Sequence, residues 1–478
     1  MESKLRVCLI NPPWKIAQRN VWSYMKPSFP HLGLLSLAAV LERDGIDVDI
    51  VDLAILSLDW TEIEEKIKIL DYDYFGITAT TPVANNAYRI SRIIKRIHPR
   101  AQVVVGGAHP TVLPQEPFQK GEADFVIRGE GEEALLKLLK GVSLKEIPGL
   151  SYRDKEGIRH IYPDGLIVDL DSLPFAAYHK IPMSLYNPGV RAERSLAIHM
   201  ITSRGCPGKC TYCYTATRPL RRRSAENIFE EIAVLYTKFG IKEIAFYDDI
   251  FTIYPTTVIQ LCNLLIKNTI DISWSCFARA DFVTLDLLKI MKSAGCHQIM
   301  YGIESGSEMI LRNIKKEVSL IKCKEAITLT KKAGIKVFCA FMFGNPGETA
   351  ETIKETVNFS IAIDPDLVMY NIAIPLPGTE MFNWAKNNNY LITENWDNYC
   401  FGGPVMKLPT IDNKSLNKKY RKAYWLFYAR PSFIIRKLIH INFQQLAALF
   451  SALKTFLPFF IKSGIRRRAI KVAHRAHF

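Results

Sequence analysis

Three cysteines lie close together in the segment Arg-Gly-Cys-Pro-Gly-Lys-Cys-Thr-Tyr-Cys-Tyr at positions 204–214. Cys206 and Cys210 are separated by three residues, and Cys210 and Cys213 by two. Thiolates at such short spacing are ligands for iron–sulfur clusters and for zinc. The next cysteine along the chain is Cys262. Three ligands for a four-iron cluster would leave one iron open to a small molecule, whereas a zinc site would need a distant fourth ligand.

The length and composition predict a globular protein with more than one domain. The chain has 478 residues, of which 48% are hydrophobic and 23% charged. One hydrophobic core rarely extends over so many residues, so we expect two or three domains. The ten cysteines are scattered irregularly, unlike a secreted disulfide framework, and the first residues lead into a strand-like run rather than a signal peptide. We therefore expect a cytoplasmic protein.

The positive charge is concentrated at the C-terminal end. The net charge is +15, and the 66 positions after Asp412 contain no Asp or Glu but fifteen Lys and Arg residues. Positions 1–412 therefore carry 47 basic and 47 acidic residues and are neutral overall. Such a charge distribution favours contact of the tail with an anionic surface.

The N-terminal third predicts a doubly wound parallel sheet over residues 1–145. Strand-like apolar runs alternate with amphipathic helical patterns, which is typical of α/β folds with helices on both faces. The strand-like runs are residues 6–10, 48–52, 74–77, 102–105 and 125–127. Ligands of such sheets bind at the carboxyl ends of the strands, where this chain has Asn11-Pro12-Pro13, Thr78 to Pro82, Gly106-Gly107-Ala108-His109 and Gly129-Glu130-Gly131-Glu132.

A second α/β region follows a connector rich in Pro, Gly and Tyr at residues 146–194. Six strand-like runs separated by helical patterns predict six β/α units, a partial barrel of the TIM type, over residues 195–395. The runs are residues 196–202, 243–247, 273–277, 298–303, 337–343 and 368–374. Residues 396–478 complete the chain as a helical, basic region. The cysteine segment directly follows the first strand of the predicted barrel.

The cysteine spacing, with Tyr212 just before the last cysteine, resembles the radical S-adenosylmethionine (SAM) superfamily. The resemblance implies a [4Fe-4S] cluster on Cys206, Cys210 and Cys213, whose open iron binds SAM and cleaves it to methionine and a 5′-deoxyadenosyl radical. Residues at later strand ends would bind SAM in this resemblance. They are Tyr212, Tyr247, Arg279, Glu304, Ser305, Gly306 and Pro375.

Two of these assignments have a structural alternative. The acids Asp248 and Asp249, which follow Tyr247, could cap the next segment instead of serving the SAM site. The Arg279 guanidinium suits the SAM carboxylate because its planar fork binds a carboxylate with two hydrogen bonds. An ion pair between Arg279 and Asp281 would equally explain this arginine.

The loops of the first domain, placed before the cysteine motif, resemble the cobalamin-binding domain that is fused to many radical SAM enzymes. The residues implied to contact cobalamin are Thr78, Thr80, Gly106, Gly107, His109, Gly129, Glu130 and Gly131. The Asp-x-His-x-x-Gly motif that supplies a lower cobalt ligand in other cobalamin domains is absent after the first strand. We therefore expect cobalamin without a histidine ligand, and structural or supporting roles for His31 and His109.

The C-terminal region resembles that of the magnesium-protoporphyrin cyclase and hopanoid-modifying relatives at Tyr424 to Pro431. Residues 446–461 are strongly apolar but are interrupted by Lys454 and Pro458. This run is shorter than the ~20 residues needed to span a bilayer. With the basic residues 466–468 beside it, it predicts a helix on the inner membrane surface. A helical cap on the barrel is the alternative, and nucleic-acid binding is disfavoured because no base-stacking motif accompanies the charge.

Together these features predict a cobalamin-dependent radical SAM enzyme. The leading hypothesis is a methyltransferase that acts on an unactivated carbon of a hydrophobic substrate, such as a lipid, an isoprenoid or a tetrapyrrole. The alternative is an oxidative cyclase or rearrangement enzyme, and a non-catalytic cluster or cobalamin sensor ranks last. A radical SAM enzyme also requires a low-potential electron donor of the flavodoxin or ferredoxin type.

Overall fold

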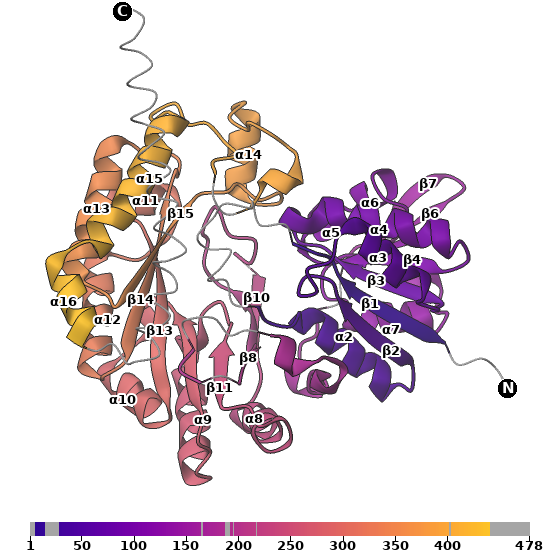
Figure 1. Ribbon diagram of the computed structural model, residues 1–478, viewed down its shortest axis with the longest axis horizontal. Coiled ribbons are helices and arrows are strands. Elements are labelled where there is room, and N and C mark those ends of the chain that lie inside the picture. The colour runs from indigo at the N-terminus through magenta and orange to yellow at the C-terminus, as the bar shows by residue number, and fades with distance from the viewer. Residues whose placement is uncertain are drawn as a thin grey trace, which may run out of the picture. The chain divides into compact units, whose positions relative to one another are not determined.

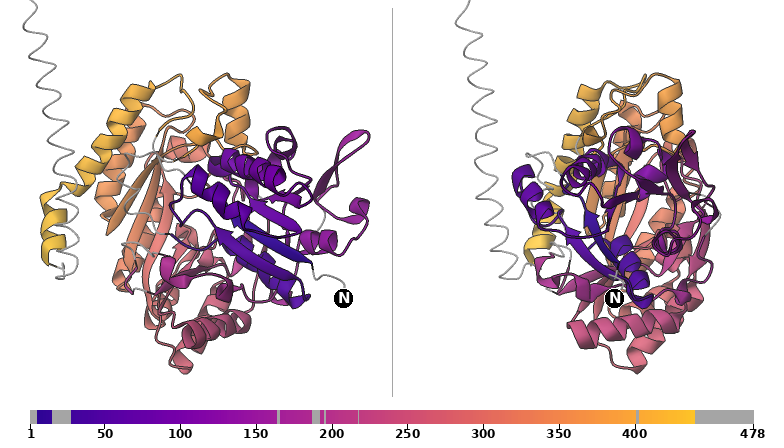
Figure 2. Two further views of the ribbon diagram at one scale, coloured as in Figure 1. Left: turned by 45° about the vertical axis from the view of Figure 1, so that its right-hand side comes forward. Right: turned by 90° about the vertical axis from the view of Figure 1, so that its right-hand side faces the viewer.

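The computed structural model describes residues 5–14, 28–163, 166–186, 192–194, 196–216, 218–400 and 403–439 (Figure 1). The chain forms two compact units, which are Met1–Arg421 and Lys422–Phe478. The first unit contains both predicted α/β regions, whose sheets are visible from two further sides in Figure 2. None of the helices within the described residues is long and apolar enough to cross a bilayer.

The first region is a seven-stranded sheet in the order β2-β1-β3-β4-β5-β6-β7. All five predicted strands are confirmed, and they run parallel to one another. Two further strands, β6 and β7, form an antiparallel hairpin that extends this sheet beside β5. The strands are β1 (Arg6–Asn11), β2 (Asp47–Asp52), β3 (Tyr74–Thr78), β4 (Gln102–Gly106), β5 (Phe125–Ile127), β6 (Leu150–Asp154) and β7 (Gly157–His160).

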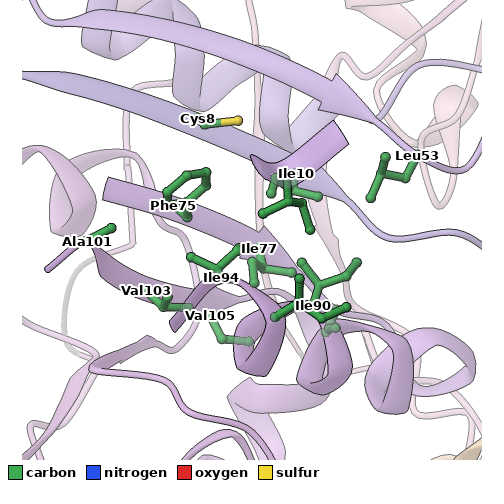
Figure 3. Packing of buried hydrophobic residues seen from close by; sticks show 14 of the residues in the cluster. Cys8, Ile10, Leu53, Phe75, Ile77, Ile90, Ile94, Ala101, Val103 and Val105 are labelled. Carbon is green, nitrogen blue, oxygen red and sulfur yellow. The ribbon is translucent and has the colours of Figure 1, made fainter. Parts of the chain in front are cut away.

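The two faces of this sheet have separate cores because successive side chains of a strand point to opposite faces. Cys8, Ile10, Phe75 and Ile77 pack with α3 and α4 on one face. Figure 3 shows them beside Ile90 and Ile94 of α4. Val7 and Leu9 pack with α2 and α7 on the other. The helices of this region are α2 (Leu32–Arg43), α3 (Trp60–Lys68), α4 (Ala84–Ile97), α5 (Ala108–Val112), α6 (Glu116–Gln119) and α7 (Glu132–Leu139).

The second region contains six parallel strands in the order β15-β14-β13-β12-β11-β8, which confirms the six predicted β/α units. Within the described residues β8 and β15 do not pair with each other, so the sheet is an open partial barrel. The strands are β8 (Ala197–Met200), β11 (Glu243–Phe246), β12 (Ser273–Ala278), β13 (Cys296–Glu304), β14 (Lys336–Phe343) and β15 (Leu367–Ile372).

The helices of the partial barrel follow their strands and pack on their sequence neighbours. Local signals fix their ends: α8 starts at the N-cap Ser224, whose side chain accepts from Asn227 N–H, and stops at Gly240 with φ +65°. The helices are α8 (Ala225–Phe239), α9 (Pro255–Lys267), α10 (Leu285–Ser293), α11 (Glu308–Asn313), α12 (Leu320–Lys332), α13 (Ala350–Ile363) and α14 (Glu380–Asn387). Two more, α15 (Asn413–Tyr428) and α16 (Pro431–Ile439), lie in the basic C-terminal region.

A short antiparallel hairpin carries the cysteine segment, and the sequence did not predict it. Its strands are β9 (Ser203–Cys206) and β10 (Arg218–Arg222), and Arg221 lies opposite Arg204. The arginine-rich β10 shows no apolar alternation, which explains why the hairpin was missed. The predicted boundaries 1–145, 146–194, 195–395 and 396–478 stay a prediction, with β6 and β7 joining the connector to the first sheet.

Candidate functional site

The three cysteines lie at the end of the β9–β10 hairpin and in the loop that joins its strands. All three thiols are free and half-buried. Gly208 lies between two of them: a Cβ atom at this position would stand 3.4 Å from Cys206 Sγ and 4.0 Å from Cys210 Sγ. The loop is anchored to the barrel by backbone hydrogen bonds, from Thr211 N–H to Ile314 O (3.0 Å) and from Met381 N–H to Thr211 O (2.8 Å).

The donor set of this loop fits an iron–sulfur cluster, because thiolates are the ligands such clusters take. Within the described ranges, no three His, Cys, Asp or Glu side chains converge closely enough to hold a single metal ion. Cys206, Cys210 and Cys213 are the residues that would hold a cluster at this loop. The fourth iron of such a cluster would then have no protein ligand and would be open to a small molecule.

Arg279 follows β12 and faces the cysteine loop. Its Nη1 atom lies 3.8 Å from the position a Cβ of Gly208 would occupy. The guanidinium is held from the other side, since Nη2 donates to Glu317 O (2.7 Å) and Nε lies 2.9 Å from Asp281 Oδ1. The ion pair with Asp281 therefore exists, and it orients Arg279 while one nitrogen faces the loop.

The end of β13 places Glu304 near the same loop, with an uncommon backbone conformation. Its φ is +69°, which a non-glycine residue adopts only where the surroundings stabilise it. Glu304 Oε1 lies 3.5 Å from Lys316 Nζ, and both side chains are largely buried. Burial raises the pKa of the Cys210 thiol, and the positive charge of Lys316 opposes this effect. Nothing in the sequence around Lys316 indicated this position.

Ser305 and Gly306 pack against α13. The Ser305 hydroxyl is 3.0 Å from Thr356 Oγ1, which accepts a 3.0 Å hydrogen bond from Gly306 N–H. A Cβ on Gly306 would stand 2.6 Å from Phe359 Cβ, so glycine permits this close approach. Pro375 is buried in the loop after β15, and Tyr247 makes edge-to-face contacts with His199 and Phe277.

The paired acids after β11 have different environments. Asp248 is buried, and its Oδ1 accepts from Thr202 N–H (3.0 Å) and from the hydroxyls of Thr202 and Ser203. Burial raises the pKa of Asp248 to about 6. Asp249 instead accepts from Thr215 Oγ1 (3.1 Å), which itself is 3.2 Å from Cys213 Sγ. Asp248 therefore ties β11 to the start of the hairpin, and Asp249 faces the cysteine loop.

A cavity of about 650 Å³ lies where the carboxyl ends of the first sheet meet the cysteine hairpin. Residues of the first domain line one part of it, among them Thr78, Gly106, Gly107, Gly129, Glu130 and Gly131. The barrel side contributes Arg204, Gly205, Thr215, Arg218, Tyr247 and Asp249. Apolar residues of the sheet and its helices extend the lining, including Leu9, Leu34, Val104 and Leu135. The cavity thus joins the two predicted cofactor regions.

Two residues predicted to contact cobalamin lie elsewhere. Thr80 is exposed and is not part of the cavity lining. His109 is fully buried, with Nδ1 3.1 Å from Thr81 Oγ1 and Nε2 3.1 Å from Glu116 Oε2. Glu116 also accepts from Trp396 Nε1 (2.8 Å), so His109 belongs to a structural polar network that reaches the C-terminal part of the first unit.

His31 lines the cavity, and its ring presents an N–H donor rather than a nitrogen lone pair that could bind cobalt. Its Nδ1 accepts from Leu34 N–H at 3.3 Å, and burial lowers its pKa to about 4. The neutral ring with an accepting Nδ1 carries its proton on Nε2, as this hydrogen bond assigns it. That atom is 3.4 Å from Thr78 Oγ1.

The cavity as a whole has a wall lined with glycines and an apolar interior. These properties fit a large ligand such as cobalamin.

Glu348 is a buried acid in the loop between β14 and α13. Its Oε2 accepts from Gly344 N–H (3.2 Å), and its Oε1 accepts from the Thr352 hydroxyl. Burial raises the pKa of Glu348 to about 7 from its ordinary value of 4.5. The folded state therefore binds this proton more tightly than the unfolded chain. The resulting stabilisation is complete below about pH 4.5 and is lost as the pH rises through about 7.

We expect Glu348→Gln to remove this part of the pH dependence. A shift of this size corresponds to up to about 3 kcal/mol between pH 5 and pH 8. The difference in melting temperature between the variant and the unmodified protein should therefore be more favourable to the variant at pH 8 than at pH 5. Differential scanning calorimetry at both values measures the difference. Glu351→Gln, on the exposed first turn of α13, is the matched control and should show equal differences at both values.

Comparisons with known proteins agree with this site. Residues 200–360 match the Radical SAM superfamily, and residues 23–139 match the B12 binding domain. The chain is 36% identical to an uncharacterized methyltransferase, PH0819, of Pyrococcus horikoshii, over 91% of this chain and 95% of the relative. It is 28% identical to an anaerobic magnesium-protoporphyrin IX monomethyl ester cyclase of Rubrivivax gelatinosus, over 97% and 84%.

Solved structures share the fold. The cobalamin-dependent S-adenosylmethionine radical enzyme OxsB, with aqua-cobalamin bound, superposes with a TM-score of 0.69 at 18% identity, over 95% of this chain and 71% of that chain. The cysteine loop, the cavity and the two matched domains together identify the family. The chain belongs to the cobalamin-dependent enzymes of the radical SAM superfamily, whose cofactors are a [4Fe-4S] cluster, SAM and cobalamin.

Proposed function

We propose that this enzyme transfers a methyl group to an unactivated carbon of a hydrophobic substrate. The cavity shared by the first sheet and the cysteine hairpin carries this proposal. A cluster held by Cys206, Cys210 and Cys213 would supply the electron that cleaves SAM to methionine and a 5′-deoxyadenosyl radical, which would abstract a substrate hydrogen. Cobalamin held in the cavity would supply the methyl group, which it would receive from a second SAM. A carrier in this cavity would face Tyr247 and Asp249, at the strand ends where the substrate radical would arise. The PH0819 relative, a methyltransferase by name, supports the same reaction.

We propose separate roles for the residues of the site. Cys206, Cys210 and Cys213 would hold the cluster. Arg279, oriented by Asp281, would bind the SAM carboxylate, while Tyr212, Tyr247, Glu304 and Pro375 would line the SAM site. Ser305 and Gly306 would act by packing that loop on α13. Thr78 and the glycines at 106, 107, 129 and 131 would lie against cobalamin.

The test follows the methyl group without requiring the substrate. Protein purified anaerobically, with cluster and cobalamin restored, is given SAM labelled with deuterium in its methyl group and a low-potential reductant. We expect about one cobalamin per chain by absorbance, label in the bound cobalamin by mass spectrometry, and formation of S-adenosylhomocysteine. Formation of 5′-deoxyadenosine alone, with no label in cobalamin, would favour the cyclase chemistry of the Rubrivivax relative.

We also propose that the C-terminal region holds the enzyme on the cytoplasmic face of an anionic membrane. Within the second unit, the large side chains Trp425, Leu426, Ile434 and Ile435 are 71%, 42%, 44% and 58% exposed. Residues 413–478 contain no acid to oppose binding to anionic lipid. The apolar run 446–461 on which the sequence prediction rests lies outside the described residues. A membrane location would suit a lipid, isoprenoid or tetrapyrrole substrate.

Truncation after Arg430 should reduce binding to vesicles that contain anionic phosphatidylglycerol, because fifteen basic residues after Asp412 fall to six. Co-sedimentation measures binding, and the iron content should equal that of the full chain. A second variant, Trp425→Ala in the full chain, should weaken binding without changing charge. Equal sedimentation of all three proteins would assign the region to ordinary packing.

A further inference from the structure

Two acids that follow β5 line the cavity and also contact the cysteine hairpin. We propose that Glu130 and Glu132 are positioning residues that clamp this hairpin to the first domain and thereby set the spacing between the cluster loop and the cavity. The functional meaning of this spacing rests on the proposed methyl transfer. The contacts themselves are independent of it.

Glu130 forms a two-pronged ion pair with Arg221 of β10. Glu130 Oε1 accepts from Arg221 Nη2 (2.7 Å), and Oε2 accepts from Arg221 Nη1 (2.9 Å). Oε2 also accepts from Ile167 N–H (3.0 Å). The side chains of Glu130 and Arg221 are only 14% and 10% exposed. Paired arginine–carboxylate hydrogen bonds fix orientation as well as distance, so this contact restrains the hairpin in more than one direction.

Glu132 makes the second contact, to β9. Its Oε1 accepts from Arg204 Nη2 (2.6 Å) and from Ser36 Oγ (2.8 Å). The Glu132 side chain is 6% exposed and that of Arg204 is 26% exposed. Arg204 Nη1 also lies 3.5 Å from Glu130 Oε2, which joins both pairs into one network. Glu132 is the first residue of α7, where the positive end of the helix dipole favours a carboxylate.

The hairpin transmits this contact directly to the cysteines. Arg204 and Arg221 are opposite each other in the β9–β10 pairing, so the two acids hold both strands at one level. Arg204 is two residues before Cys206, and Gly205 between them has φ +94°. A Cβ on Gly205 would stand 2.2 Å from Pro219 O, so the strands are tightly apposed here. A displacement of Arg204 would therefore move Cys206.

These contacts give Glu130 a different role from the cobalamin contact that the sequence predicts. Both of its carboxylate oxygens already accept hydrogen bonds from Arg221, and one also accepts from the Ile167 backbone. The hydrogen bonds from Arg221 lower the pKa of Glu130 below its ordinary value despite the opposing effect of burial. The carboxylate is thus committed to the hairpin, although it lines the cavity.

The test compares Glu130→Gln and Glu132→Gln with Glu133→Gln in the full chain. Glu133 is the next residue of α7, is 66% exposed and lies 3.7 Å from Lys137 of the same helix, so it is a matched control. In protein without cobalamin, we expect faster amide hydrogen exchange over residues 203–222 in the first two variants and no change in the control. This readout requires neither bound cobalamin nor methyl transfer.

A second readout uses enzyme with both cofactors restored. The magnetic coupling between cob(II)alamin and the reduced cluster, seen by electron paramagnetic resonance, depends on their spacing. We expect a changed or broadened coupling in Glu130→Gln and Glu132→Gln, with iron content and cobalamin affinity unchanged. The rate at which the deuterium label passes from SAM to the bound cobalamin should fall by up to about 100-fold. A displacement of about 1 Å between reacting groups can slow a reaction by that much.

Three outcomes would overturn the clamp. Exchange and coupling equal to those of Glu133→Gln would show that the acids do not position the hairpin. Loss of cobalamin affinity with unchanged exchange would make them cobalamin ligands. If a glutamine variant does not fold, Arg221→Lys keeps the charge but lacks the planar fork, and unchanged exchange in that variant would also contradict the proposal. A wild-type enzyme without methyl transfer would contradict only the proposed function.

Discussion

Each of the single substitutions Cys206→Ala, Cys210→Ala and Cys213→Ala should remove the cluster and abolish cleavage of SAM. Each thiol is free. Cys206 ends β9, and Cys210 and Cys213 lie in the loop that joins β9 to β10. The hairpin itself contains no fourth cysteine that could replace a lost ligand, and the next cysteine in the sequence, Cys262, is fully buried in α9. Enzymes accelerate reactions by about 10⁶-fold or more, so SAM cleavage should fall below detection.

Iron and sulfide content, and 5′-deoxyadenosine formation with dithionite as reductant, measure the result. Cys400→Ala is the matched control, because Cys400 is also free and half-buried but lies outside the hairpin. It should keep both cluster and cleavage. Thermal midpoints within a few degrees of the unmodified protein would show that the alanine variants are folded. Cleavage that persists in any of the three would contradict the assignment of the cluster ligands.

Gly107→Ala should strongly destabilise the first domain and deplete it of cobalamin. Gly107 has φ +105°, and a Cβ there would stand 2.7 Å from Ala79 O and 2.9 Å from Ala79 N. The backbone cannot move aside easily, because Ala79 N–H donates to Gly106 O (2.8 Å) and Ala79 O accepts from His109 N–H (3.0 Å). Strain and collision together should cost about 3 kcal/mol of unfolding free energy.

Gly141→Ala provides the matched control for this prediction. Gly141 also has a positive φ, +71°, but nothing lies within 4 Å of its ideal Cβ position. Only the conformational cost applies there, about 1 kcal/mol. Calorimetry gives the stabilities, and absorbance after anaerobic reconstitution gives the cobalamin content. Equal effects of the two substitutions would show that the contact of Gly107 with Ala79 is unimportant for this wall of the cavity.

The sequence alone was sufficient for the order of the main elements. Strands such as β1 and β14 are continuous apolar runs, and the helices between them carry local start and stop signals such as Ser224 and Gly240. These patterns depend on neighbours within a few residues, so they can be recognised without knowledge of the fold. The spacing of Cys206, Cys210 and Cys213 is local in the same sense. The hairpins β6–β7 and β9–β10 lacked such patterns and were not predicted.

The tertiary structure decided which of the candidate side chains face one another. His109 and Glu130 both follow parallel strands with glycine nearby, yet one is fully buried beside Glu116 and the other binds Arg221, 91 residues away. Arg279 is held by Asp281 and by the Glu317 carbonyl, and Lys316 approaches Glu304 without any sequence signal. The contacts of Glu130 with Arg221 and of Arg279 with the Glu317 carbonyl join residues far apart in the chain. Their partners therefore depend on how the sheets and loops pack, which local spacing does not encode.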